Sequence, residues 1–213
     1  YPGYIGGMNW GSMTVDPARQ LLLLSSNRFA MLNQLLTREE GNRRGMHAVP
    51  SGKSADLSGG QPMEGTPYAV DVAPFLSPLF MPCQQPPFGM ISAVDLKTKK
   101  LLWTHPFGNT RNSGPMGRGL GITAPMGVPN SGGAITTAAG LTFIGASQDG
   151  LIRAFDTRSG KELWSAVLPA GGHATPMTYK LRDGKQYIVI AAGGSKGMLT
   201  PEGDAVVAFA LPD

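Results

Sequence analysis

Short apolar runs separated by turn residues dominate the second half of the chain and predict strands there. The runs at 133–137, 141–147, 151–156 and 162–168 are rich in β-branched, aromatic or small apolar residues, and Gly, Asp, Asn or Ser separates each run from the next. Runs of this length between such residues are typical of β-strands and tight turns. Four strands within about forty residues predict an antiparallel meander of the size of one propeller blade.

Part of this unit occurs twice. Residues 150–164 repeat residues 89–103 without a gap, at an offset of 61 residues, and Gly, Ile, Ala, Asp, Lys, Leu and Trp recur at matching places. Such a repeat indicates one structural unit used several times. The Asp of each copy can cap the turn after its strand, and the Trp can fill the space between neighbouring sheets. We therefore interpret as packing residues Asp95, Trp103, Asp156 and Trp164.

Two further units flank the clearest one. The first takes its strands from 9–15, 21–26, 90–95 and 101–105, and the last from 176–179, 186–192 and 205–210, without a fourth strand. We therefore predict an all-β fold: three four-stranded antiparallel blades of an eight-bladed β-propeller, the last of them incomplete. The predicted blades are 1–107 with a long loop insertion at 27–88, then 129–169, then 172–213.

Three blades cannot close a ring, because a propeller needs four or more blades around its axis. Two sheet edges would stay exposed and prone to aggregation. The chain also begins at Tyr1. We therefore expect it to be the C-terminal part of a larger protein whose remaining blades lie upstream.

Composition narrows the range of functions. Charged residues make up 15% of the chain, the net charge is +4, and the basic residues are not interleaved with aromatic ones. This pattern argues against nucleic-acid binding. The single cysteine, Cys83, leaves no internal disulfide. No apolar run approaches the length that a membrane span requires.

The insertion at 27–88 shows little regular structure. Met31, Leu32, Leu35 and Leu36 recur at one-turn spacing and predict a short helix around 30–40. Loops of this length are often lids or binding loops, so a surface excursion and a cover over an axial site both stay open. Packing of the insertion is indicated by Phe29, Phe75, Phe80 and Phe88.

The common enzyme motifs are absent, and no metal-ligand spacing joins His47, His105 and His173. His105 follows a docking Trp and is interpreted as structural, whereas His173 precedes an inner strand and can face the axis. Glycine and small polar residues cluster before the inner strands, where glycine lets a backbone approach a ligand closely. These clusters predict a flat or bulky ligand on the axis and lie at 6–11, 129–133 and 191–195.

The chain resembles the quinoprotein dehydrogenases, eight-bladed propellers that hold pyrroloquinoline quinone. Its Ala-x-Asp…Gly-Lys-x-Leu-Trp unit is similar to their tryptophan-docking motif. Further motifs resemble the membrane-bound branch, which includes glucose and quinate/shikimate dehydrogenases. They span essentially the whole chain: Gly7-Met-Asn-Trp10, Gly65-Thr-Pro-Tyr68, Pro82-Cys-x-x-Pro-Pro-Phe-Gly89, Gly132-Gly133, the run 141–145 and the run 184–189.

The resemblance implies oxidation of a polyol or sugar. In the family a catalytic Asp takes the hydroxyl proton of the substrate while hydride moves to the quinone, whose carbonyl is polarised by Ca²⁺ (or Mg²⁺) and a basic side chain. Electrons then pass to ubiquinone. The resemblance also implies the periplasmic side of the bacterial inner membrane, with membrane attachment through an upstream part. The catalytic Asp and Lys of this branch lie upstream of the Asn-Trp motif, so the isolated chain is expected to be inactive.

Site residues follow from the same resemblance. Asn9 matches the family Asn near the reactive carbonyls and suits both a cation and a quinone oxygen; Trp10 beside it contacts the cofactor or only packs. Ser131 stands where other members place a bulky residue against the quinone ring. The remaining cofactor contacts are Gly132, Gly193 and Gly194, and the substrate contacts are His173 and Ser195.

Two alternatives bear on function. Glucose-oxidising relatives carry a His near position 195, so Ser195 followed by Lys196 favours another polyol such as quinate or shikimate. The rival to an enzyme is a non-enzymatic propeller scaffold of the outer-membrane assembly type, which shares the docking repeats. The place of Asn9 relative to the axis discriminates between the enzyme and the scaffold.

Overall fold

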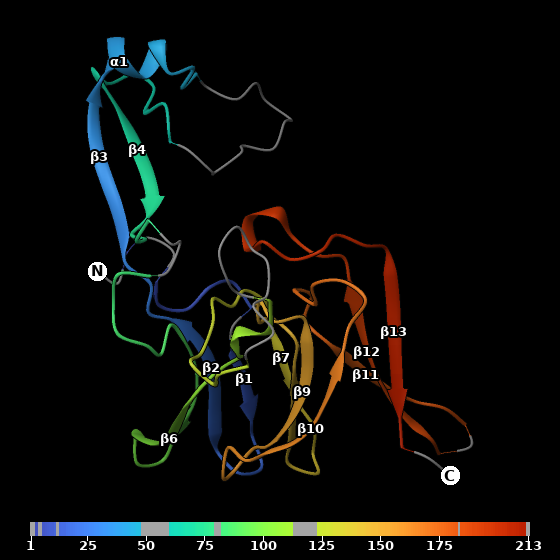
Figure 1. Cartoon of the computed structure of the whole chain (residues 1–213). Helices are drawn as coiled ribbons and strands as arrows, with labels where there is room; N and C mark the ends of the chain where they lie inside the picture. Colours follow the sequence, from blue (N-terminus) through green and yellow to red (C-terminus); the bar gives the residue numbers. More distant parts are fainter. Residues whose placement is uncertain are drawn as a thin grey trace.

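The computed structural model describes residues 3, 6–11, 13–47, 60–78, 82–112, 123–182 and 184–211. Within these residues the strands form three larger antiparallel sheets and one two-stranded sheet, with the larger sheets side by side in Figure 1. The fold is therefore all-β, as the sequence predicts. The number of blades in the complete ring stays a prediction.

The first sheet is assembled from two hairpins far apart in the sequence. Its strand order is β1-β2-β5-β6, and each neighbouring pair is antiparallel. The insertion leaves the sheet after β2 and returns at β5, as expected from the interrupted repeat. The strands are β1 (Met13–Asp16), β2 (Leu21–Asn27), β5 (Gly89–Asp95) and β6 (Lys100–Pro106).

The second and third sheets are simple meanders. The second runs β7-β8-β9-β10 and the third runs β11-β12-β13, and the predicted segments match the observed strands to within a few residues. Short 3-10 turns, η1 (Thr110–Asn112) and η3 (Lys196–Met198), lie in the connections. The strands are β7 (Ala134–Thr136), β8 (Leu141–Ile144), β9 (Leu151–Asp156), β10 (Glu162–Val167), β11 (Met177–Lys180), β12 (Gln186–Ala192) and β13 (Ala205–Ala210).

The core lies between the sheets, because each middle strand buries side chains against its neighbouring sheet. One cluster joins the first and second sheets through residues such as Ile91, Phe107 and Phe155. A second cluster joins the second and third sheets through Ile152 and Ile190, among others. Burial of this apolar area at about 25 cal/mol per Å² is the main force that holds successive sheets together.

The repeated Asp and Trp behave as packing residues. Asp95 accepts the backbone N–H groups of Lys97 and Thr98 and so closes its turn. Asp156 caps the matching turn in the second sheet in the same way. The side chain of Trp103 extends from β6 toward the second sheet and donates its indole N–H to the carbonyl of Thr157, at 3.3 Å.

The insertion corrects one sequence prediction. Residues 31–37, expected to be helical, form strand β3 (Met31–Thr37), which pairs with β4 (Tyr68–Pro74). The helix α1 (Arg38–Arg43) begins only after Thr37, whose hydroxyl accepts the N–H of Glu40. A short apolar run is compatible with the period of a helix and with that of a strand. Pairing with β4 favours the strand here, because it buries Leu36 on the same face as Ala69.

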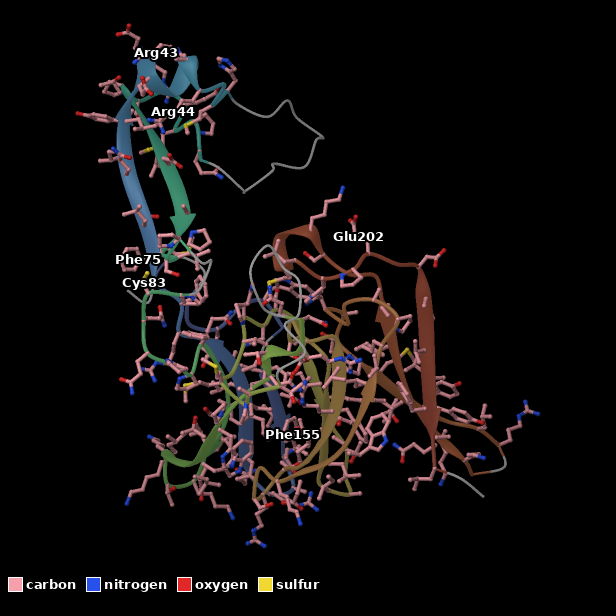
Figure 2. All side chains as sticks on the ribbon, in the orientation of Figure 1. Arg43, Arg44, Phe75, Cys83, Phe155 and Glu202 are labelled. Carbon is pink, nitrogen blue, oxygen red and sulfur yellow. The ribbon has the colours of Figure 1, made fainter. Side chains whose placement is uncertain are left out.

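The described part of the insertion is a hairpin that stands away from the larger sheets (Figure 1). Its ends meet where Arg28 donates its N–H to the carbonyl of Phe88, at 2.7 Å, beside the edge-to-face pair of Phe29 and Phe88. Phe75, in contrast, is 45% exposed near the base of the hairpin, whereas Arg43 and Arg44 lie at its tip (Figure 2). Phe80 lies outside the described residues. No helix in the described ranges is long and apolar enough to span a membrane.

Candidate functional site

The first strands of the three larger sheets, β1, β7 and β11, begin close together. A side chain on Gly133, which precedes β7, would collide with the hydroxyl of Thr175 before β11 and come within 2.8 Å of the carbonyl of Gly11 before β1. The glycines therefore allow three backbones to converge. We call the residues around this convergence the axial cluster, which consists of Asn9, Trp10, Ser131, Gly132, His173, Ser195 and Thr200.

Asn9 lies in the axial cluster and is exposed. Its Nδ2 donates to the hydroxyl of Ser131 at 3.0 Å, and its Oδ1 accepts the backbone N–H of Trp10 at 2.7 Å. Trp10 as a whole residue is 65% exposed. This amide therefore connects the chain before the first sheet to the chain before the second sheet while one face stays accessible.

Asn27, at the end of β2, aligns these two segments. Its backbone exchanges two hydrogen bonds with Gly7, at 2.8 and 2.7 Å. Its side chain donates to the carbonyl of Asn130 at 2.7 Å and accepts the N–H of Asn130 at 2.9 Å. Because Gly7 lies two residues before Asn9 and Asn130 one residue before Ser131, the buried Asn27 contributes to the spacing of the Asn9–Ser131 pair.

His173 links the second sheet to the third. Its Nδ1 lies 2.9 Å from the carbonyl oxygen of Ser131, and its Nε2 lies 2.9 Å from the hydroxyl of Thr200. That hydroxyl also accepts the backbone N–H of Ser195 at 2.9 Å. A continuous series of hydrogen bonds thus runs from Asn9 through Ser131, His173 and Thr200 to Ser195.

The predicted glycines occupy different environments. Gly132 has φ 146°, and a Cβ there would lie 2.5 Å from the carbonyl of His173. Gly194 has φ 72° and would meet Glu202 at 2.6 Å, whereas a Cβ on Gly193 would find its nearest neighbour at 3.9 Å. Gly132 and Gly194 are thus required by the backbone, whereas a Cβ on Gly193 would make only an ordinary van der Waals contact.

One buried ion pair lies outside the axial cluster. Asp149 and Arg153 form a buried ion pair between the first and second sheets. Burial opposes ionisation of Asp149, but the hydrogen bond and charge of Arg153, with hydrogen bonds from Ser147 and Asn109, outweigh it and lower the pKa of that carboxyl. Among the described residues no group of three or more His, Cys, Asp or Glu side chains could hold a metal ion.

The structure brings together most of the predicted site residues. Asn9, Ser131, His173 and Ser195 belong to one hydrogen-bonded series, with Trp10 and Gly132 beside it. Sequence reasoning missed Asn27 and Thr200. Asn27 ends a predicted strand, which is a weak signal, and Thr200 follows the Gly193-Gly194 pair without a recognisable motif.

The chemistry of the axial cluster is that of a polar binding surface. It offers an amide, hydroxyl groups and an imidazole, which together donate and accept hydrogen bonds. The exposed Trp10 adds a flat apolar face. This arrangement suits a planar ligand with several oxygen atoms.

Comparison with known proteins gives one consistent pattern. Residues 1–188 match the family described as PQQ: glucose/ethanol/alcohol dehydrogenase, β-propeller domain. The chain is 46% identical over 221 residues to a glycerol dehydrogenase large subunit of Gluconobacter thailandicus, covering 100% of the chain and 30% of that protein. It is 42% identical over 212 residues to a quinate/shikimate dehydrogenase (quinone) of Acinetobacter baylyi, covering 99% of the chain and 26% of that protein.

A further relative and a solved structure are also similar to the chain. A quinoprotein glucose dehydrogenase of Escherichia coli is 42% identical over 213 residues, which are 100% of the chain and 26% of that protein. The solved structure of a europium-containing methanol dehydrogenase superposes with a TM-score of 0.55 at 23% identity, over 91% of the chain and 26% of that structure. The chain therefore spans less than a third of the length of these relatives.

Proposed function

Because the chain belongs to the PQQ-dependent glucose/ethanol/alcohol dehydrogenase β-propeller family, we propose that it is the cofactor-facing portion of a dehydrogenase. The reaction is oxidation of a polyol or sugar by hydride transfer to pyrroloquinoline quinone. The observation that supports this most is the Asn9–Ser131 pair, which presents an exposed amide where the inner strands converge.

The axial cluster fits the proposed cofactor, a planar quinone with carbonyl and carboxylate oxygens. The Asn9 amide and the Ser131 hydroxyl can donate to such oxygens, and the exposed Trp10 offers a flat contact through its indole. When bound, the quinone supplies the two-electron oxidant that accepts hydride from the alcohol carbon. The residues of this chain bind and orient it.

We assign roles within this proposal as follows. The Asn9 carbonyl oxygen is one ligand of Ca²⁺ (or Mg²⁺), since such cations prefer oxygen ligands, and no catalytic base is assigned to this chain. His173 and Ser195 border the substrate. The cofactor contacts are Asn9, Trp10, Ser131, Gly132, Gly193 and Gly194.

The substrate class rests on the names of the relatives, which are dehydrogenases of glycerol, quinate/shikimate and glucose. We propose a small polyol, with quinate or shikimate favoured by Ser195, ubiquinone as the electron acceptor, and a location on the periplasmic side of the inner membrane. Upstream blades of the same protein complete the site. The scaffold alternative has less support, because a scaffold does not need the exposed Asn9 amide at the axial end.

Titration of the full-length apo protein with pyrroloquinoline quinone in the presence of Ca²⁺ tests this function. Loss of the amide in Asn9→Ala is expected to weaken cofactor binding about 10-fold or more, as for hydrogen bonds to charged groups. The control is Asn33→Ala, an exposed Asn on β3 outside the axial cluster. A wild-type protein that does not bind the quinone, or equal affinities in both variants, contradicts the proposal.

A dye-linked assay of the reconstituted protein addresses the substrate. Quinate, shikimate, glucose and glycerol are compared by kcat/KM, and oxidation of at least one is expected. Absence of oxidation for the whole panel, despite saturation with the quinone, would reject a polyol or sugar dehydrogenase.

A further inference from the structure

The carbonyl of Ser131 fixes the direction of one hydrogen bond of His173. The carbonyl oxygen of Ser131 can only accept, so the Nδ1 atom that lies 2.9 Å from it carries a proton. In the neutral imidazole Nε2 is then an acceptor. The hydroxyl of Thr200, 2.9 Å away, therefore donates to Nε2.

Thr200 completes the link, by which we mean the hydrogen bonds that join Ser131 to His173 and His173 to Thr200. Only 6% of Thr200 is exposed, and its hydroxyl oxygen accepts the backbone N–H of Ser195. With a neutral imidazole, the single hydroxyl proton of Thr200 goes to Nε2 of His173. Its alternative acceptor, the carbonyl of Ser195, is farther away at 3.3 Å. The Ser195 loop of the third sheet thus holds the imidazole, and the imidazole holds Ser131.

Two glycines leave the room that this link needs. A Cβ on Gly171 would collide with the Thr200 hydroxyl and lie 2.7 Å from Nε2 of His173. A Cβ on Gly132 would lie 2.5 Å from the His173 carbonyl. No side chain larger than hydrogen fits at either place without moving the link.

We propose that His173 and Thr200 are positioning residues, which hold Ser131 from the third sheet and thereby set the place of the Asn9 amide. The inference deepens the proposed function and rests on it. His173 acts through Ser131, because both of its ring nitrogens are engaged in the link. Thr200 acts through His173 and need not touch the cofactor.

The test is a titration of the full-length apo protein with pyrroloquinoline quinone, in which quenching of the protein fluorescence reports binding. Thr200→Val keeps the shape of the side chain but removes the hydroxyl, and it is expected to weaken binding about 2- to 10-fold, the range for one hydrogen bond. Thr200→Ser restores the hydroxyl and is expected to bind within about 2-fold of wild type. Wild-type affinity in Thr200→Val overturns the inference, as does a Thr200→Ser variant that binds as weakly as Thr200→Val.

A double-mutant cycle separates positioning from general stability. If Thr200 acts through Ser131 and Asn9, Thr200→Val weakens binding less in an Asn9→Ala background than in the wild type, because coupled residues are not additive. The fold-losses multiply if Thr200 only stabilises the third sheet, and that result rejects the inference. Thr178→Val is the matched control, since it removes an exposed hydroxyl on β11 that bonds to Tyr187. It is expected to leave the affinity unchanged in both backgrounds.

The outcomes distinguish this inference from the proposed function. A wild-type protein that does not bind the quinone removes the proposed function and the inference together. A wild-type protein that binds the quinone, with Thr200→Val unchanged, removes only the inference. His173→Asn adds a further comparison, because its amide N–H can replace Nδ1–H but cannot reach Thr200; affinity between those of wild type and His173→Ala is expected, and affinity no better than that of His173→Ala counts against a role through Ser131.

Discussion

The side chain of Asn27 donates to the backbone carbonyl of Asn130 at 2.7 Å and accepts the backbone N–H of Asn130 at 2.9 Å. Both residues are buried, at 7% and 1% exposed. The same Asn27 pairs its backbone with Gly7. The spacing of Asn9 and Ser131 therefore depends on a residue that touches neither of them through its side chain.

Asn27→Ala is expected to destabilise the protein and to weaken cofactor binding together. The variant leaves the buried N–H and carbonyl of Asn130 without these partners, at a cost of about 1–3 kcal/mol for each unsatisfied group. Thermal denaturation and quinone titration of the full-length protein measure the two effects. Asn33→Ala, at an exposed position, should change neither; an unchanged quinone affinity in Asn27→Ala would show that the pair does not depend on Asn27.

Trp103 connects the first sheet to the second across 54 residues of sequence. Its ring also packs where Gly160 lacks a side chain, since a Cβ there would lie 2.6 Å from the indole. Trp103→Ala is expected to cost about 3 kcal/mol or more and to lower Tm. Leu101→Ala on the same strand, at a residue that is 58% exposed, is the control; similar losses of Tm in both variants would contradict a docking role.

The ion pair of Asp149 and Arg153 predicts sensitivity to acid. Because the pKa of Asp149 is lower in the folded protein than its ordinary value, its contribution to stability is present above about pH 4 and is lost as pH falls through the folded pKa. Asp149→Asn leaves Arg153 buried without its main partner, which is expected to cost about 3–5 kcal/mol at neutral pH.

The pH dependence provides the measurement for this pair. The Tm difference between wild type and Asp149→Asn should be largest at neutral pH and should shrink as the pH falls below about 4. Asp204→Asn, at an exposed position, should match wild type throughout. A Tm difference that does not depend on pH would exclude ionisation of Asp149 as the source of stability.

Gly171→Ala tests the room around Thr200 without removing any hydrogen-bonding group. The added methyl group would displace the Thr200 hydroxyl and the His173 Nε2 atom, and about 10-fold weaker quinone binding is expected, equivalent to about 1.4 kcal/mol. Gly197→Ala is the matched control, because a Cβ there finds its nearest neighbour at 3.8 Å. Equal quinone affinities in the two variants would contradict the expected effect, because the methyl group at position 171 would then fit without disturbing Thr200 and His173.

Much of the fold could be predicted because strand signals are local. Alternating apolar runs and Gly- or Asp-containing turns located β8, β9, β12 and β13 closely. The repeat also identified Trp103 as a docking residue, since a Trp that recurs after a turn is large enough to fill the space between neighbouring sheets. The helix expected at 30–40 was wrong, because a seven-residue apolar run becomes a strand when a partner such as β4 is available.

The sequence by itself determined the all-β class, the interrupted first sheet, the docking residues and the family resemblance, because each depends on residue type and spacing along the chain. Only the tertiary structure decided that Asn27 and Thr200 support the axial cluster. Their importance arises from contacts with Asn130 and His173, which lie 103 and 27 residues away in the chain. Hydrogen bonds between segments so far apart leave no periodic pattern in the sequence, so the folded arrangement of the three sheets was needed to find them.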